Sequence, residues 1–118
     1  FDQKNNLPKV EPNTVLIDGY IEETLPKYVK DQAYLNSVAF IHIDTDTYGP
    51  AKVALRELKP YFKSGTIILF DELLGYPNWR NHEFKALNEV LDPSEYEFIG
   101  FAHNGLRAFL IKAAIRII

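Results

Sequence analysis

The stretch VAFIHIDTDTYGPAKVALRELKPYFKSGTIILFDE, residues 38–72, decides the fold. Its two apolar runs, residues 38–43 and 66–70, are typical of strands that are buried on both faces of a parallel sheet. The residues between them predict a helix, because Pro50 suits a first helical turn and apolar residues then recur at helical spacing until the turn at Gly65. A right-handed crossover of this kind brings the two strand ends close together.

The residues before this stretch predict one more strand and one more helix. Residues 1–13 are interpreted as an extended connection, and the β-branched run at 14–17 predicts a short strand. Residues 22–34 predict a helix with Thr24 as its cap, since apolar side chains recur near one face. These residues give a first strand and helix pair.

The residues after the central stretch predict a helix and a β-hairpin. The helix is expected over residues 81–91, with Asn81 as its cap. Residues 96–102 and 106–112 are strand-like runs joined by a turn that includes His103, which predicts an antiparallel pair. The expected fold class is α/β, with a mostly parallel sheet and a C-terminal antiparallel β-hairpin.

Length and composition favour a single domain over residues 1–118. Apolar residues make up 47% of the chain and charged residues 25%, which is ordinary for a protein with a packed core. A net charge of -3 without a cluster of Lys and Arg argues against nucleic acid as a partner. No apolar run has the length of a membrane span and no signal region opens the chain, so a cytoplasmic protein is expected.

Acidic side chains are predicted at the carboxyl ends of both central strands, where ligands bind in open α/β sheets. Asp44 and Asp46 follow the first strand, and Asp71 and Glu72 follow the second. Neighbouring carboxylates at the edge of an apolar core repel one another unless a positive charge lies between them. Because the chain has no cysteine, its hard oxygen ligands favour Mg²⁺, Mn²⁺ or Ca²⁺. We therefore expect a divalent-metal site, although acidic residues at strand ends also cap helices.

Other candidate residues allow more than one interpretation. Asp46 is either a metal ligand or a charge that stabilises the N-terminus of the next helix. His82 is either a general base in the cleft or a solvated histidine of a first helical turn. His42 lies between isoleucines of a buried strand and is expected to be a satisfied core histidine. The aromatic loop 76–79 either walls a substrate pocket or packs as a satellite of the core.

Residues 38–79, with the segments LPKV (7–10) and LIDGYIEETLP (16–26), resemble class I S-adenosylmethionine-dependent O-methyltransferases of the macrocin O-methyltransferase type. The likeness is to the C-terminal half of these enzymes, and catechol O-methyltransferase is similar at a greater distance. The resemblance implies a partial Rossmann-like methyltransferase sheet and a small-molecule hydroxyl acceptor, such as a sugar or natural product. It also implies that Asp44, Asp71 and Glu72 bind the metal, which orients the acceptor hydroxyl and lowers its pKa.

The general base is left open by this resemblance. Catechol O-methyltransferases have a lysine three residues after the first metal aspartate, where this chain has Thr47. Asp46 and His82 are the candidates that remain for the base.

The resemblance implies S-adenosylmethionine as the cofactor, but two of the family's cofactor motifs are absent. The chain lacks the Gly-rich loop that follows the family's first strand and the acidic residue that follows its second. Asp18, Gly19 and Tyr20 match only the turn that flanks the adenine. The chain is therefore expected to be a fragment without the N-terminal cofactor-binding βαβ unit, whose exposed strand edges favour association between copies.

Two alternatives stand beside the methyltransferase hypothesis. Asp44-Thr45-Asp46 also matches the DxD with which nucleotide-sugar glycosyltransferases bind Mn²⁺, and the opening of a phosphatase motif from which Tyr48 departs. Neither of these enzyme classes accounts for Asp71 and Glu72 together with the terminal hairpin. The other alternative is a truncated methyltransferase fold without activity.

Overall fold

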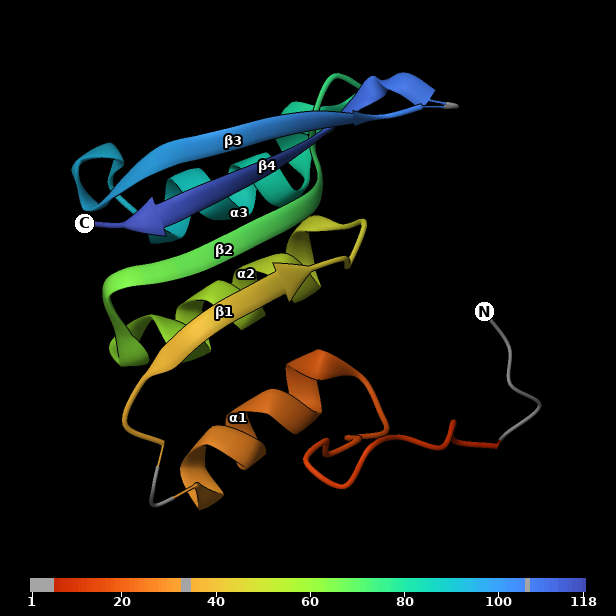
Figure 1. Cartoon of the computed structure of the whole chain (residues 1–118), viewed down its shortest axis with the longest axis vertical. Helices are drawn as coiled ribbons and strands as arrows, with labels where there is room; N and C mark the ends of the chain where they lie inside the picture. The colour runs from red at the N-terminus through yellow and green to blue at the C-terminus, as the bar shows by residue number, and fades with distance from the viewer. Residues whose placement is uncertain (1–5, 33–34, 106) are drawn as a thin grey trace.

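Four strands form one sheet, in the order β1-β2-β4-β3, in this computed structural model (Figure 1). The structure describes residues 6–32, 35–105 and 107–118. β1 and β2 are parallel, whereas β4 pairs antiparallel with both β2 and β3. The α/β class and the C-terminal hairpin are therefore confirmed. The strands are β1 (Val38–Ile43), β2 (Phe62–Leu74), β3 (Tyr96–Asn104) and β4 (Arg107–Ile117).

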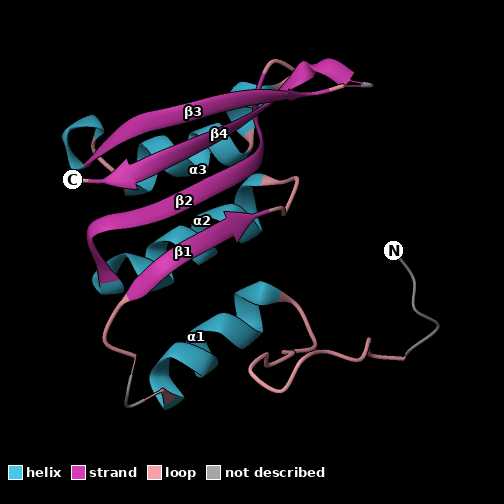
Figure 2. Cartoon of the chain, viewed as in Figure 1, coloured by secondary structure: helices cyan, strands magenta, loops and turns pink. Residues whose placement is uncertain are grey.

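The helices α2 and α3 pack behind one face of this sheet (Figure 2). α1 packs against α2 on the same side of the molecule as β1. Within the described residues, no helix combines the length and the apolar character that crossing a membrane requires. The helices are α1 (Ile21–Asp31), α2 (Tyr48–Leu58) and α3 (Glu83–Val90), and the short 3₁₀ turns are η1 (Lys59–Tyr61), η2 (Trp79–Asn81) and η3 (Pro93–Glu95).

The hydrophobic core lies between the two helices and the face of the sheet that they cover. Cross-strand pairing sets which side chains share this face, because Ile43 lies opposite Phe70 and Ile68 lies opposite Ile115. The core residues include Ile43, Ile68, Phe70 and Ile115 from the strands and Ala51, Leu55, Ala86 and Leu87 from the helices.

The opposite face of the sheet is open in the part of the chain that the structure describes. Phe40 is 57% exposed on this face, and Ile67 and Leu69 are only half-buried. The prediction that both central strands are buried on both faces is therefore wrong, because helices cover the described sheet on one side only.

Residues 14–17 do not form the predicted strand. Val15 is 72% exposed, and the described strands include no neighbour with which this segment pairs. A β-branched run needs a partner strand to satisfy its backbone groups, so its local preference alone does not produce a strand.

The first helix begins earlier than predicted, at Ile21, with Tyr20 as its N-cap. Thr24 lies inside α1 and its hydroxyl donates to the Tyr20 carbonyl oxygen at 3.0 Å, so its prediction as the cap is wrong. The end of α1 is at Asp31, and positions 33 and 34 of the predicted helix lie outside the described residues.

The second central strand is longer than predicted at both ends. α2 ends at Leu58, one 3₁₀ turn follows, and the chain enters β2 at Phe62. β2 then continues to Leu74, because its pairing with β4 extends to the partner Ile111. The strand therefore includes four residues beyond the apolar run that predicted it.

The last helix and the hairpin differ from the prediction at their ends. Asn81 belongs to η2, and His82 rather than Asn81 is the N-cap of α3. His103 lies in β3 opposite Ile111, so its prediction as a turn residue is wrong. Position 106 of the predicted second strand lies outside the described residues.

Candidate functional site

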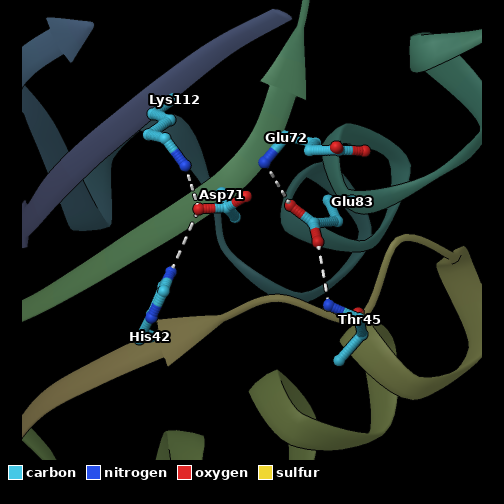
Figure 3. A network of polar contacts seen from close by, with 6 residues as sticks. All are labelled: His42, Thr45, Asp71, Glu72, Glu83 and Lys112. Carbon is cyan, nitrogen blue, oxygen red and sulfur yellow. Dashed lines mark hydrogen bonds and ion pairs between the residues drawn. The ribbon is translucent and has the colours of Figure 1, made fainter. Parts of the chain in front are cut away.

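Asp71 and Glu72 lie inside β2, so the prediction that they follow its end is wrong. Successive side chains of a strand point to opposite faces of the sheet. Figure 3 shows the Asp71 carboxylate directed toward His42 and Lys112, and the Glu72 side chain directed away from them. The longer strand therefore separates two carboxylates that are neighbours in the sequence.

The Asp71 carboxylate is held by two basic side chains on the open face. Lys112 Nζ donates a hydrogen bond to Asp71 Oδ1, and His42 Nε2 lies 3.4 Å from the same oxygen. The Lys112 ammonium, with a smaller contribution from His42, holds the pKa of Asp71 below its usual range, although partial burial opposes this. His42 is 44% exposed at its side chain, so it is not the core histidine that the apolar strand predicted.

Glu83 is the buried acidic residue of the site, and no sequence signal identified it. Its Oε1 accepts from the Thr45 backbone N–H at 3.3 Å, and its Oε2 accepts from the Glu72 backbone N–H at 3.4 Å. The side chain is 0% exposed. Glu83 therefore ties α3 to the loop after β1 and to β2 (Figure 3).

Burial raises the pKa of Glu83 to about 7, and the negative charges of Asp46 and Glu72 add to this effect. The two backbone N–H groups that it accepts from oppose the increase. A carboxyl group that titrates near neutral pH consequently lies beneath the loop that carries Asp46. An acidic residue in the first turn of a helix is common in any sequence, which is why this one gave no signal.

The loop after β1 carries the first acidic pair. Asp44 follows β1 directly, as predicted, and is exposed. Asp46 has φ of 59°, a left-handed conformation that aspartate adopts more readily than most residues. Its charge contributes to the raised pKa values of both Glu83 and Tyr76, so Asp46 lies close to both groups.

The aromatic loop after β2 has one side toward these acidic groups and one toward α3. Burial, with the charges of Glu83, Glu72 and Asp46, raises the pKa of Tyr76 to about 12. The Trp79 ring packs edge-on against Phe84 of α3, with the ring centroids 4.7 Å apart. The loop therefore has a packing contact with α3 as well as a tyrosine beside the acidic groups.

His82 lies beside Tyr76, with the two ring centroids 6.1 Å apart. Its Nε2 is 3.4 Å from Asn78 Nδ2. Among the described residues, the buried atoms His82 Nδ1 and Tyr76 Oη have no hydrogen-bond partner. Tyr76 Oη and His82 Nδ1 are therefore buried polar atoms that need a partner, such as a water molecule.

The predicted cofactor residues lie just before α1, at the edge where the helices begin (Figure 2). A Cβ atom on Gly49, in the first turn of α2, would lie 3.7 Å from Glu22 Oε1, in the first turn of α1. The turn Asp18-Gly19-Tyr20 is therefore near the start of α2. Tyr20 itself is 78% exposed, and the cofactor roles of these three residues stay predictions.

The predicted metal ligands do not form a metal site as they stand. Over residues 6–32, 35–105 and 107–118, no three His, Asp or Glu side chains group in a way that could hold an ion. The Asp71 carboxylate faces Lys112 instead, on the side of β2 opposite to Glu72. These residues therefore do not fit the cation in this arrangement, and the ligand roles of Asp44, Asp71 and Glu72 stay predictions.

An apolar hollow of about 230 Å³ lies beside Lys112 on the open face. Its walls come from the strands β2, β3 and β4, and Lys112 supplies its charged group. The residues that line it are Leu69, Gly100, Phe101, Ala102, Lys112 and Ala114.

Similarity to solved structures shows that the chain has an O-methyltransferase fold. The chain is similar to two solved structures of CalS11, one of them the apo form of this TDP-rhamnose 3'-O-methyltransferase of calicheamicin biosynthesis. Each is 28% identical over 85% of this chain, with TM-scores of 0.66 and 0.68. The chain spans 40% and 36% of those structures, which is less than half of their length. None of the known protein-family models matches the chain, and no curated protein matches it.

Proposed function

We propose that this chain is part of an S-adenosylmethionine-dependent O-methyltransferase of the macrocin type that acts on a hydroxyl group of a small molecule, such as a sugar. The observation that carries the proposal is the similarity to CalS11, a sugar O-methyltransferase, over 85% of the chain. Both solved structures are methyltransferases, which favours methyl transfer over the glycosyltransferase and phosphatase alternatives. A cytoplasmic location is part of the same proposal.

S-adenosylmethionine, when bound, supplies an electrophilic methyl group to the acceptor oxygen. The turn Asp18-Gly19-Tyr20 is proposed to border the adenine, because the exposed Tyr20 ring lies near the start of α2. The chain supplies the acceptor side of the reaction through the loop after β1. Since the chain spans only 40% of CalS11, further groups that bind the cofactor are proposed to lie in residues outside this sequence.

The proton of the acceptor hydroxyl needs a base, and two side chains of this chain are candidates. Asp46 is exposed in the loop and carries a carboxylate close to Glu83 and Tyr76. His82 has one ring nitrogen, Nδ1, that is buried without a partner among the described residues. Glu83 is a positioning residue in this proposal, because it holds the backbone at Thr45, next to Asp46.

The test is transfer of a labelled methyl group from S-adenosylmethionine to TDP-rhamnose and to other nucleotide sugars, using the polypeptide in which this chain occurs. We expect product formation, with a loss of at least about tenfold in kcat when the base is replaced by Asp46→Asn or His82→Gln. The variant that leaves kcat unchanged identifies a residue that is not the base. Binding of a nucleotide sugar without any binding of S-adenosylmethionine in calorimetry would contradict the proposed reaction.

A further inference from the structure

The Asp71 carboxylate already has a cation beside it, and that cation belongs to the chain. Lys112 Nζ donates to Asp71 Oδ1, and His42 Nε2 lies 3.4 Å from the same oxygen (Figure 3). The Lys112 side chain is 34% exposed and the Asp71 side chain is 23% exposed, so both members of this ion pair are only partly exposed. The positive charge is therefore held close to the carboxylate in a place that water only partly screens.

Backbone pairing across three strands determines this meeting. His42 of β1 lies opposite Leu69 of β2, which puts the histidine on the same face as Asp71, two residues further along. Phe70 lies opposite Ala113, so Lys112 of β4 projects on the Asp71 face of the sheet. The register up to Phe70 therefore places the three side chains on the open face, and the pairing shifts just beyond Phe70, where Asp71 lies.

We propose that Lys112 supplies the positive charge that the sequence alone assigns to a divalent cation at Asp71, so that Asp71 is not a metal ligand in this chain. An aspartate paired with a lysine has no net charge left to attract an ion. A divalent ion at this oxygen would also have to displace the ammonium group or tolerate its repulsion.

The ligand requirements of hard cations lead to the same conclusion. Ca²⁺ takes six to eight oxygen ligands and Mg²⁺ six, usually with more than one carboxylate or with phosphate groups. Glu72, the second acidic residue of the pair, points to the opposite side of β2 (Figure 3). Asp71 therefore offers a single carboxylate between two basic side chains, and it would bind such an ion only weakly even if the ammonium were removed.

Two variants of Lys112 separate its charge from its bulk. Lys112→Gln removes the ammonium and keeps a long side chain, whereas Lys112→Arg keeps the positive charge and serves as the matched control. Mn²⁺ is the probe, because its binding to the chain can be followed through the relaxation of water protons, with no enzymatic reaction required. Circular dichroism of each variant gives the fraction that is folded.

We expect the apparent affinity for Mn²⁺ to be at least tenfold higher in Lys112→Gln than in the unaltered chain and in Lys112→Arg. Saturable binding in the unaltered chain that disappears in Asp71→Asn would overturn the proposal, because Asp71 would then be a ligand despite Lys112. Equal Mn²⁺ affinity of the unaltered chain, Lys112→Gln and Lys112→Arg would also overturn it, because the charge of Lys112 would then not affect Mn²⁺ binding.

A second measurement tests the interaction between Asp71 and Lys112 directly. It remains informative even if one of the variants is less stable. A double-mutant cycle of Asp71→Asn and Lys112→Gln in urea unfolding is expected to show a coupling of about two- to fivefold in the folding equilibrium constant. This coupling is expected to shrink at high salt. A coupling indistinguishable from onefold at low salt would show that the two side chains do not interact, and the proposal would fail.

Discussion

The covered face and the open face of the sheet differ in what holds their side chains in place. On the covered face, Ile68, Phe70 and Ile115 are fully buried against helices, and their apolar surface stabilises the fold. On the open face, Phe40 is 57% exposed and the contacts that position Asp71 are polar. Substitutions on the covered face are therefore expected to change stability, whereas substitutions on the open face should mainly change charge and association.

The largest difference in stability between the two faces is expected when one phenylalanine on each face is replaced by alanine. Phe70→Ala leaves a cavity in the core and is expected to lower the free energy of unfolding by about 3–5 kcal/mol. Phe40→Ala removes an exposed ring and is expected to change it by less than about 1 kcal/mol. Urea unfolding followed by circular dichroism measures both. Similar losses in the two variants would mean that the open face is covered in solution.

Glu83 lies at the edge that joins β2 to α3, and its raised pKa makes stability depend on pH. Its folded pKa of about 7 is above the usual 4.5, so the folded state binds the proton more tightly than the unfolded state. The resulting stabilisation is complete below pH 4.5 and is lost as the pH rises through about 7. The expected loss in the free energy of unfolding is up to about 3 kcal/mol.

Glu83→Gln is expected to abolish this pH dependence, because the amide does not titrate. The variant should also be less stable at pH 5 by about 1–3 kcal/mol, since an amide nitrogen cannot accept from the second backbone N–H. Urea unfolding at pH 5 and pH 8 measures both quantities. If the free energy of unfolding of the variant changed with pH as much as that of the unaltered chain, another group would be responsible for the pH dependence.

Gly75 and Gly65 both have positive φ, but a side chain would be crowded at Gly75 and would have open space at Gly65. Gly75 follows β2, and a Cβ there would overlap the Phe109 carbonyl oxygen of β4. Gly65, near the start of β2, has φ of 96° but no heavy atom within 4 Å of such a Cβ. Gly75→Ala is expected to cost about 2–3 kcal/mol and Gly65→Ala about 1 kcal/mol. Equal melting temperatures for the two variants would contradict the close approach of Gly75 to β4.

The smallest effect on stability is expected from Phe40→Lys on the open face. Within the described residues, β1 pairs only with β2, so its other edge presents unpaired backbone groups that favour association. We expect the unaltered chain to form dimers at high concentration and the lysine variant to remain monomeric. Size-exclusion chromatography with light scattering measures the mass. If the unaltered chain were monomeric at all concentrations, the prediction of association would be wrong.

Local patterns predicted the elements of the fold better than their ends. The apolar runs that became β1 and β2 and the helical spacing of α2 were sufficient to place the strand, helix, strand unit. The end of β2 could not be predicted, because the strand continues through Asp71 and Glu72, past a register shift after Phe70, to the pairing of Leu74 with Ile111 of β4. Residues 14–17 failed as a strand for the opposite reason, since no described strand pairs with them.

Sequence patterns also predicted only part of the candidate site. Asp44 lies directly after β1, as its position after an apolar run indicated. The role of Glu83 was missed, because its two backbone partners come from positions 11 and 38 residues away. His42 was misplaced, since alternation within an apolar strand does not reveal which face lacks a covering helix.

The sequence by itself determined the α/β class, the order of the central elements and the acidic residues near one edge of the sheet, because these follow from local spacing and side-chain chemistry. Only the tertiary structure decided which charges meet. Register between β2 and β4 brings Lys112 to Asp71, and the packing of α3 buries Glu83 beneath the loop after β1. Such meetings depend on segments far apart in the chain, and short-range patterns carry no information about their register.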